Sequence, residues 1–526
     1  MKAQLILLML ALNAVAFSQP FQIEWSSLER QNGRLSSIIA RNSNDFFALR
    51  RSGGVILGKL KASHHEDLRV TASEALELKA QGSMATYEGS AIVGDRFVVF
   101  LSDKKDGENT FFMTEYSDDV TPDGDAMELA SYSIEGKRGR FQGDFSVITS
   151  RGRDYFAVVW SIPGKKTEEP FYGYKIFDKE LSLVAEGEYE MPFEQQFIAL
   201  NGYYLSNTGD LFLTVTEYER NTDSKRIFKN YKDFVATHIY HISEDGLEDM
   251  IIDLEGKRVE AMTFSSDNDK IFTIAGTYGD KGRSGIKGMF FLKADFKNQE
   301  ILAEGFEEFG ADFITQDWSD RQKKKMEKKK EQGKDVEPAL YNYRMRQLEV
   351  LSDGSVIGSM EQYYVVVSTY RDPRTGATTT TYTYYYNDII TFRVGEDGGF
   401  DWLNKIQKFQ VSTNDGGYFS SYERFLSDGK LYFIFNDNAS NYDESGEFID
   451  DEKVSSSRVS KRKNVVAMVA IDLESGDLTR ESFFTRSDLG AVAVPKLFNV
   501  DYESGEVLLY AIMGKKEKFG VMKISK

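Results

Sequence analysis

The chain has 526 residues and a formal net charge of −18, contains no cysteine, and carries 38 Phe and 28 Tyr. Without cysteine it can hold no disulfide, no lipid anchor on an N-terminal cysteine and no thiolate metal site. Its negative charge makes nucleic acid an unfavourable partner, because binding to phosphates requires a positive face. Many aromatic residues and only eight Pro favour a folded, β-rich protein over a disordered one.

The first 18 residues have the pattern of a signal peptide. They combine one Lys, an apolar run over residues 5–17 and small residues shortly before Gln19. This predicts cleavage before Gln19, which leaves residues 19–526 as the mature chain. The apolar run is too short to span a bilayer comfortably, and no later stretch is long enough. We therefore expect an exported protein that does not span a membrane.

A tight polar turn followed by a strand-like run recurs eight times. The turn dipeptides begin at Asn44, Gly94, Arg153, Thr208 (or Gly209), Asn268, Asp353, Asp428 and Ser504. Such turns join antiparallel strands, and repeats of this length are typical of a β-propeller with four-stranded blades. The sequence predicts one all-β propeller over residues 19–526, with eight blades. Seven blades is the alternative, because a degenerate blade is easily counted twice.

The two ends of the mature chain are predicted to share the last blade. Three strands would come from the C-terminal segment, and the fourth from FQIEWSSLE, residues 21–29. Pairing of the terminal strands would close the ring and leave fewer free sheet edges.

Long insertions are predicted to gather on one face of the ring. In each blade the first and third turns share one face, whereas the second loops and the crossovers to the next blade share the other. We assign to the second face the crossover of about 35 residues before blade six and the insertions at residues 103–109, 162–170, 220–230, 278–288, 370–380 and 436–460. Binding residues often lie on long loops held by a rigid scaffold. The alternative is that this face merely tolerates insertions.

A basic helical insertion is predicted at about residues 315–337. Between Arg321 and Glu331 there are seven positive and two negative charges; Asp317 is a candidate cap, and Gly333 and Pro338 would end the helix. A solvated helical arm is one interpretation, and docking to an acidic protein or to surface glycans or lipids is the other. The candidate binding residues are Trp318, Arg321, Lys324 and Lys328.

A projecting hairpin is predicted at about residues 361–390, formed by the second and third strands of blade six, with RDPRTG at its tip. A turn centred near Pro373–Arg374 would pair Tyr364 with Tyr384 and Tyr370 with Thr378. Period-two alternation would then place five tyrosines on one side. These candidate contact residues are Tyr364, Tyr370, Tyr382, Tyr384 and Tyr386. A self-supporting hairpin without a ligand is the alternative.

Calcium is a possible ligand of the acidic segment after residue 435. Its candidate oxygen ligands are Asn436, Asp437, Asn438, Asp443 and Glu444, although their spacing matches no known calcium loop. No other cofactor is expected.

No catalytic motif stands out. His238 and His241 are three residues apart in a predicted strand and therefore point to opposite faces, so they form no metal pair. The chain has no G-x-S-x-G elbow. Whether the protein is an enzyme stays open, with a non-catalytic protein favoured. A hydrolase or lyase acting on polysaccharide or peptide at the channel mouth is the alternative.

The segments EQYYVVVS (361–368), YTYYYNDIITFRV (382–394) and TNDGGYFSSYERFLSDGKLYFIFNDN (413–438) resemble a group of uncharacterised exported proteins of Bacteroidota. The resemblance is clearest between Trp318 and Asn438. It implies a propeller in the periplasm or at the cell surface of a Gram-negative bacterium, and it implies no activity. We expect a non-catalytic binding or scaffold protein whose partner is an envelope protein or a glycan; the oligomeric state is open.

Overall fold

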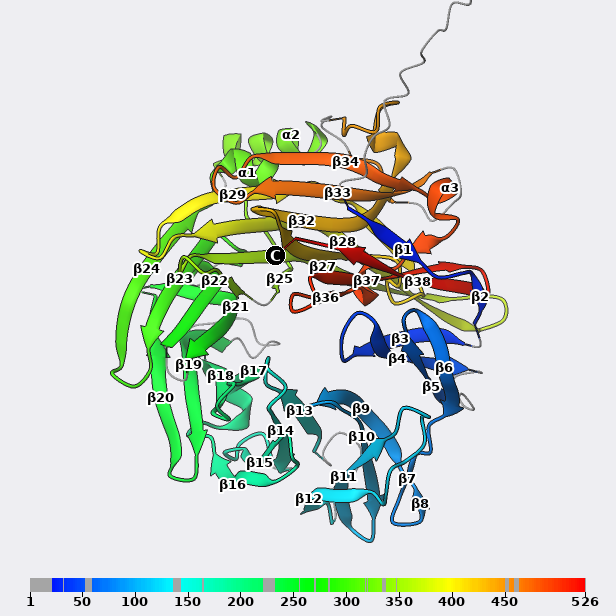
Figure 1. Cartoon of the computed structure of the whole chain (residues 1–526). Coiled ribbons are helices and arrows are strands. Elements are labelled where there is room, and N and C mark those ends of the chain that lie inside the picture. The colour runs from blue at the N-terminus through cyan, green and yellow to red at the C-terminus, as the bar shows by residue number, and fades with distance from the viewer. Residues whose placement is uncertain are drawn as a thin grey trace, which may run out of the picture.

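A computed structural model describes residues 21–31, 33–52, 59–135, 143–162, 165–220, 232–254, 256–268, 271–281, 284–316, 318, 320–333, 337–346, 348–449, 454–457 and 463–525. The predicted signal peptide lies outside them. Eight sheets, each four antiparallel strands deep, follow one another around a ring in chain order (Figure 1). The protein is therefore an all-β propeller with eight blades, and the seven-bladed alternative is wrong.

Each blade is named here by its strands from the ring axis outward. Blades one to four contain β3 (Arg34–Ala40), β4 (Asp45–Ser52), β5 (Lys59–Glu66) and β6 (Arg69–Ala75); β9 (Thr86–Val93), β10 (Arg96–Lys105), β11 (Glu108–Tyr116) and β12 (Met127–Ser133); β13 (Phe145–Thr149), β14 (Tyr155–Ile162), β15 (Phe171–Asp178) and β16 (Leu183–Glu190); and β17 (Ile198–Leu205), β18 (Leu211–Arg220), β19 (Lys232–Ser243) and β20 (Gly246–Ile252).

In blades six and eight some strand positions are shared by two shorter strands. Blades five to eight contain β21 (Lys257–Asn268), β22 (Ile271–Asp280), β23 (Gly288–Asp295) and β24 (Glu300–Glu308); β25 (Tyr343–Met345) with β26 (Glu349–Val350), β27 (Val356–Arg371), β28 (Thr378–Val394) and β29 (Phe400–Ile406) with β30 (Gln410–Thr413); β31 (Tyr422–Ser427), β32 (Lys430–Asn438), β33 (Asn464–Asp472) and β34 (Leu478–Thr485); and β35 (Val492–Ala493) with β36 (Asn499–Asp501), β37 (Glu506–Met513), β38 (Lys516–Lys523) and β1 (Ile23–Trp25) with β2 (Glu29–Arg30).

Short elements lie in the connections. They are β7 (Lys79–Ala80), β8 (Ser83–Met84), α1 (Ala311–Thr315), α2 (Asp320–Glu331), α3 (Arg486–Leu489), η2 (Gln195–Phe197), η3 (Ala439–Asn441) and η4 (Pro495–Leu497). No helix of the described ranges is long and apolar enough to cross a membrane.

The predicted turn dipeptides join the first and second strands of their blades. Gly94, Gly209 and Gly429 have φ values of 55°, 92° and 70°, in the left-handed region that glycine enters without steric penalty. These turns set the point at which each chain reversal occurs, so their recurrence in the sequence fixes the blade count.

The hydrophobic core lies between neighbouring blades. Phe47 of β4 stacks on Phe97 of β10 with ring centroids 4.1 Å apart, and Phe212 of β18 meets Phe272 of β22 edge to face at 4.6 Å. All four rings are fully buried. Burying one such side chain stabilises the fold by about 1.5–3 kcal/mol, so each blade is held chiefly by the blades beside it.

The predicted closure by the chain ends is confirmed. β1 forms the outer edge of blade eight, and its Trp25 pairs with Gly520 of β38. A Cβ at Gly520 would lie 2.6 Å from the indole, so only glycine allows the ring to lie flat on the strand. In Figure 1 the blue N-terminal strand accordingly lies beside the red C-terminal strands.

The seam between blades one and eight contains buried polar groups. His65 of β5 stacks on Phe46 at 4.7 Å and meets Phe519 of blade eight edge-on at 4.7 Å. Arg50 of β4 donates to Glu517 of β38 at 2.7 Å, and both side chains are buried. Burial, and secondly the positive charge of Arg50, lower the pKa of His65 to about 3, so this imidazole is neutral in the folded protein.

The prediction that every long insertion is a loop between the second and third strands or a crossover between blades needs two corrections. Residues 103–109 are no long loop, because β10 and β11 are joined by a two-residue turn of Asp106 and Gly107, with φ values of 53° and 84°. A longer connection, residues 117–126, joins β11 to β12 and lies on the opposite face. The insertion at 220–230 falls almost wholly outside the described residues. The crossover with α1 and α2, the β27–β28 hairpin and the β32–β33 loop do lie on the predicted face, called here the crossover face.

Candidate binding site

A cavity of about 820 Å³ opens on the crossover face between the α1–α2 segment and the base of the β27–β28 hairpin. Its aromatic lining comes from Trp318, Tyr341, Tyr343, Tyr364 and Phe409. Its polar lining includes Asp320, Arg321, Gln322, Gln362, Asn387, Asp388, Lys405 and Lys408. A concave site with several aromatic walls and a few polar groups is the usual form of a ligand-binding site.

A fully buried ion pair forms the floor beneath this cavity. Lys408 is 1% exposed, and its Nζ donates to Glu361 Oε1 at 2.7 Å, to the Tyr386 carbonyl at 2.9 Å and to Gln410 Oε1 at 3.2 Å. Ser421 Oγ donates to the other Glu361 oxygen at 2.7 Å. Burial lowers the pKa of Lys408, although the charge of Glu361 opposes this. Because every proton of the ammonium has an acceptor, this pair stabilises the site and is not free for chemistry.

Side-chain amides form hydrogen bonds in the cavity wall between the β27–β28 hairpin and the crossover. Gln362 Nε2 donates to the Tyr341 carbonyl at 3.2 Å, and Asn387 Nδ2 donates to Gln362 Oε1 at 2.9 Å. Tyr364 stacks on Tyr385 with centroids 4.5 Å apart and an interplanar angle of 10°. These contacts fix the polar wall on regular strands, whereas Tyr341 and Phe409 remain 47% and 37% exposed to solvent.

Three of the predicted binding residues meet at this cavity. Trp318 precedes α2, Arg321 lies in its first turn, and Tyr364 lies on β27. Lys324 and Lys328 are exposed further along α2 and do not line the cavity. The helix ends near the predicted Gly333, whose φ is 70°, while Asp317 lies outside the described residues. The sequence predicts these residues in two separate segments, and the fold brings three of them together.

The predicted tyrosine face of the hairpin is wrong by one residue. Tyr364 pairs with Tyr385 and Tyr370 with Thr379. Facing residues share one side of a sheet, so Tyr364 and Tyr370 lie on one side, and Tyr382, Tyr384 and Tyr386 lie on the other.

The hairpin tip explains this register. Asp372 Oδ1 accepts the amides of Arg374 and Thr375 at 2.7 and 3.0 Å, and the Asp372 amide donates to the Ala377 carbonyl at 2.8 Å. The turn therefore encloses four residues, and its centre lies between Arg374 and Thr375. The predicted pairs imply a three-residue turn centred on Arg374, and the one additional residue moves every partner by one.

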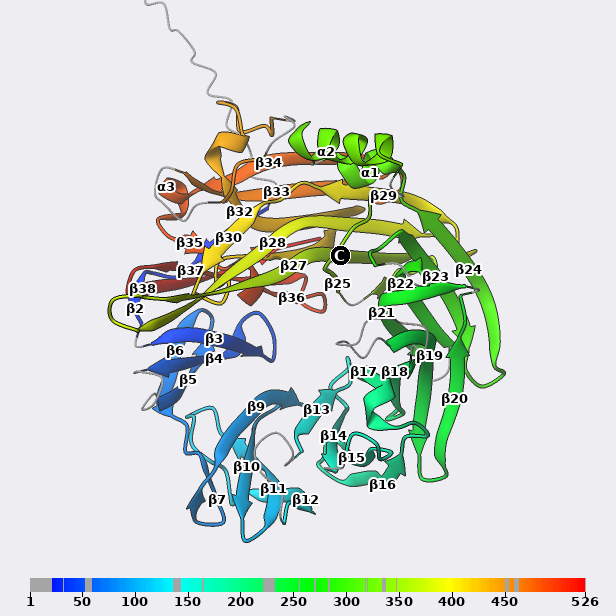
Figure 2. The same ribbon diagram turned by 180° about the vertical axis from the view of Figure 1, so that it is seen from behind.

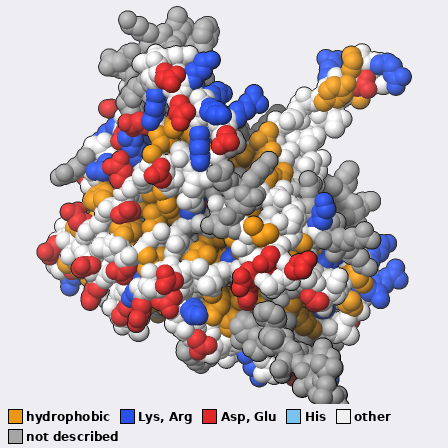
Figure 3. Space-filling model, turned by 90° about the horizontal axis from the view of Figure 1, so that it is seen from above, with side chains coloured by type: hydrophobic (Ala, Val, Ile, Leu, Met, Phe, Trp, Pro, Cys, Tyr) orange, Lys and Arg blue, Asp and Glu red, His pale blue; other side chains and the backbone are white. Residues whose placement is uncertain are grey.

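A third strand, not expected from the sequence, supports the hairpin. β30 pairs with residues 383–386 of β28, and the Asn414 amide donates to the Tyr382 carbonyl at 2.9 Å (Figure 2). Beyond this support the hairpin is two-stranded and stands clear of the body at the upper right of Figure 3. Tyr370 and Tyr382 are 63% and 44% exposed there. Neither lines the cavity.

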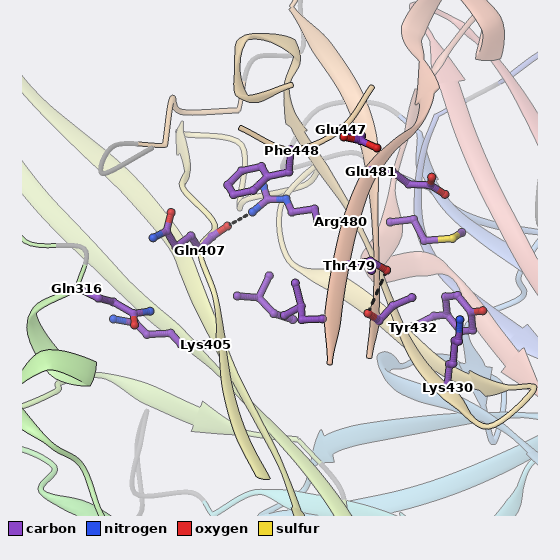
Figure 4. A pocket seen from close by; sticks show the side chains of 14 residues that line it. Gln316, Lys405, Gln407, Lys430, Tyr432, Glu447, Phe448, Thr479, Arg480 and Glu481 are labelled. Carbon is purple, nitrogen blue, oxygen red and sulfur yellow. Dashed lines mark hydrogen bonds between the residues drawn. The ribbon is translucent and has the colours of Figure 1, made fainter. Parts of the chain in front are cut away.

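A second cavity, of about 860 Å³, lies between the outer strands of blades six and seven (Figure 4). Arg480 of β34 spans it, donating to the Gln407 carbonyl at 2.6 Å and lying 3.9 Å from the Phe448 ring centroid. The same guanidinium pairs with buried Asp437 and donates to the Tyr442 hydroxyl at 3.0 Å. This cation is thus fully engaged within the protein. No pattern in the sequence indicates this arrangement.

Two of the candidate calcium ligands, Asp437 and Asp443, have protein partners. The Asp437 carboxylate accepts from Asn441 Nδ2 at 2.8 Å and from the Tyr442 hydroxyl at 2.7 Å, besides Arg480. Asp443 Oδ1 accepts from the Ser445 amide at 2.8 Å. Over the described residues, no three His, Asp or Glu side chains are grouped so as to hold a metal ion. Calcium binding stays an untested alternative for this segment.

The histidines of blade four connect strands. His238 lies between Asp249 (Nδ1, 2.9 Å) and Glu217 (Nε2, 3.3 Å), and His241 lies between Glu248 (Nδ1, 2.9 Å) and Asp210 (Nε2, 3.0 Å). Burial lowers the pKa of His238, but the hydrogen bonds and charges of its two carboxylates outweigh this and raise it. Each imidazole has its own acidic partners, as expected for residues on opposite faces of a strand.

A third depression, of about 860 Å³, lies on the opposite face, among the turns of blades one to three. Two of its cations form ion pairs within the protein: Arg41 pairs with Asp118 at 2.7 Å, and Lys179 pairs with Asp154 at 2.8 Å. The cavity beside α2 is therefore the site at which partly exposed aromatic rings and amide groups meet.

No family model and no curated protein matches the chain. Solved structures that resemble it include the WD40 domain of SCAP from fission yeast, with 11% identity, a TM-score of 0.38 and coverage of 96% of this chain and 95% of that one. The β-propeller domain of the Trilobed protease from Pyrococcus furiosus has 10% identity, a TM-score of 0.33 and coverage of 88% and 98%. Prolyl oligopeptidase B from Galerina marginata has 11% identity, a TM-score of 0.32 and coverage of 77% and 55%. Each TM-score is below 0.5, so the propeller assignment rests on the sheet topology.

Proposed function

We propose that this protein is an exported, non-catalytic binding protein of the cell envelope and that its crossover-face cavity takes a carbohydrate. The observation that carries the proposal is the cavity of about 820 Å³ in which Trp318, Arg321 and Tyr364 meet. The export signal predicted over residues 1–18 and the resemblance to exported propellers support the location.

The lining suits sugar rings. Aromatic side chains give large, rigid contact area and pack against the C–H faces of a pyranose. Side-chain amides offer both donors and acceptors, which match hydroxyl groups. The Gln362 and Asn387 amides are held by neighbours on strands, so little ordering is needed on binding. The acids of the lining do not form a prepared catalytic pair: Asp388 accepts the Lys408 amide at 3.1 Å, and Asp320 lies exposed at the start of α2.

Affinity electrophoresis through gels containing dextran, mannan, polygalacturonate or chondroitin sulfate tests the proposal. We expect retardation of the wild type by at least one polymer, and about tenfold weaker binding for Trp318→Ala and for Tyr364→Ala, equivalent to about 1.4 kcal/mol. Tyr382→Ser is the matched control, because this exposed tyrosine lies on the same hairpin outside the cavity. Equal retardation of all four proteins would contradict the cavity site. Release of reducing ends from a retained polymer would replace it with the hydrolase alternative.

A further inference from the structure

We infer that the carbohydrate is an anionic polysaccharide, whose chain leaves the cavity along α2; this inference rests on the proposed function. The helix begins at the cavity, because its first-turn residues Asp320 and Arg321 line the wall. A polymer seated in the cavity would therefore meet α2 as it emerges.

One side of α2 presents a stripe of cations. Arg321, Lys324 and Lys328 are three and four residues apart, so they lie on one helix face, and they span about 10 Å at 1.5 Å per residue. All three are exposed. Among the described residues, no acidic side chain pairs with any of them. Figure 3 looks down on this region, where Lys and Arg side chains gather.

The cations of this stripe repel one another, because positive charge is in excess along α2. Between Arg321 and Glu331 the net charge is +5 in a chain whose total is −18. Like charges at positions i and i+4, such as Lys324 and Lys328, destabilise a helix. Lys328, Lys329 and Lys330 in the last turn gain something from the helix dipole, but that interaction fades within a turn. A polyanion laid along the stripe would relieve the repulsion.

The composition of α2 distinguishes among polyanions. Met326 is its one apolar side chain and is half-buried, so the helix has no apolar face with which to enter a bilayer. An acidic protein would complement the cations, but the aromatic rings and side-chain amides of the adjoining cavity favour sugar faces and hydroxyl groups. A polysaccharide with charged units supplies sugar faces for the cavity and regularly spaced anions for the stripe.

Two pairs of polymers test the inference, each pair differing only in charge: polygalacturonate with its methyl ester, and dextran sulfate with dextran. We expect stronger retardation by at least one anionic member than by its neutral counterpart, and weakening as salt rises. Lys324→Glu/Lys328→Glu should bind the anionic polymer at least tenfold more weakly. Lys105→Glu/Lys166→Glu is the control, since it makes the same charge change at exposed sites in blades two and three.

The outcomes separate the two proposals. Equal, salt-independent binding of the members of a pair, unchanged by Lys324→Glu/Lys328→Glu but weakened by Trp318→Ala, would overturn the inference and leave the carbohydrate site standing. Anionic binding that Lys324→Glu/Lys328→Glu weakens and Trp318→Ala does not would overturn the cavity as the sugar site. Binding to phosphatidylglycerol vesicles, with no retardation by any polymer, would overturn both. Circular dichroism of each variant verifies that it is folded.

Discussion

The neutral imidazole at the seam of the ring makes acid stability a quantitative test of the closure. His65 is 2% exposed and lies between Phe46 and Phe519. Its Nε2 lies 3.1 Å from Ser63 Oγ, and its Nδ1 has no hydrogen-bond partner. A proton on this ring would therefore be buried, poorly solvated and close to the Arg50 cation, which together account for a folded-state pKa of about 3.

The sign of the effect follows from the two states of the chain. The folded pKa of about 3 lies below the ordinary value of 6.5, so the unfolded chain takes up the proton first as pH falls. The stability that the neutral imidazole provides is complete above pH 6.5 and is lost on the way down to the folded pKa. At pH 4.5 the loss is about 2.7 kcal/mol, from two pH units at 1.36 kcal/mol each.

Urea unfolding followed by circular dichroism at pH 7.5, 6.0 and 4.5 measures this loss. Between the two extremes the wild type should lose about 2.7 kcal/mol more than His65→Gln, which cannot titrate. Phe519→Leu is the control, because it removes a ring contact with His65 but no titrating group. Its free energy of unfolding should therefore fall between pH 7.5 and 4.5 by as much as that of the wild type. If His65→Gln loses as much unfolding free energy as the wild type over this pH range, the imidazole is not held neutral by the seam.

Four further outcomes test other parts of the structure. Lys408→Met should cost about 3–5 kcal/mol in urea unfolding, because it leaves the Glu361 charge buried without a partner; Lys408→Met/Glu361→Leu should recover part of that loss, and no recovery would contradict the pairing. Trp25→Ala should lower the melting temperature, because the indole covers Gly520 in the closing strand pair; an unchanged temperature would mean that the terminal strand does not stabilise the ring. Excess chelator should leave the melting temperature unchanged, since the Asp437 oxygens already have protein donors; a fall would indicate a bound cation. Tyr382→Ser should stay folded, since its ring is 44% exposed, and loss of the circular dichroism signal would show that the hairpin supports the body.

The blade count and the closure could be predicted because both depend on local patterns. A turn dipeptide reverses the chain wherever it occurs, and alternation of apolar residues marks the strands on either side. Gly94 and Gly429 show the outcome, since both have the positive φ that such turns require. The terminal strand could be found by the same pattern, because residues 21–29 complete a blade that otherwise has three strands.

The hairpin register could not be fixed from the pattern alone. It depends on whether the tip encloses an odd or an even number of residues, and the Asp372 side chain decides this through its bonds to two backbone amides. The segment 410–413 was equally hard to place as a strand, because it borders a glycine-rich turn and owes its conformation to pairing with β28.

The cavity lies beyond sequence reasoning for a different reason. Trp318 and Tyr364 could be singled out, but their meeting depends on how the crossover folds back against the hairpin. Lys408 shows the limit most clearly. From the sequence alone this lysine is expected to be solvated. The folded chain buries it completely, because its ammonium pairs with Glu361, 47 residues earlier.

Blade eight combines β1 with β37 and β38, so it can form only after these later strands have been synthesised. Trp25 of β1 pairs with Gly520, which is synthesised about 500 residues later. Each doubling of such a separation adds only about 0.6 kcal/mol to the entropic cost of closing the loop. The separation in sequence therefore adds little to the free-energy cost of closing the ring. It does slow folding, since contacts distant in sequence form slowly. Until they form, the outward edge of β38 is open to any other extended chain. Ring closure therefore also removes an edge through which a second chain could pair.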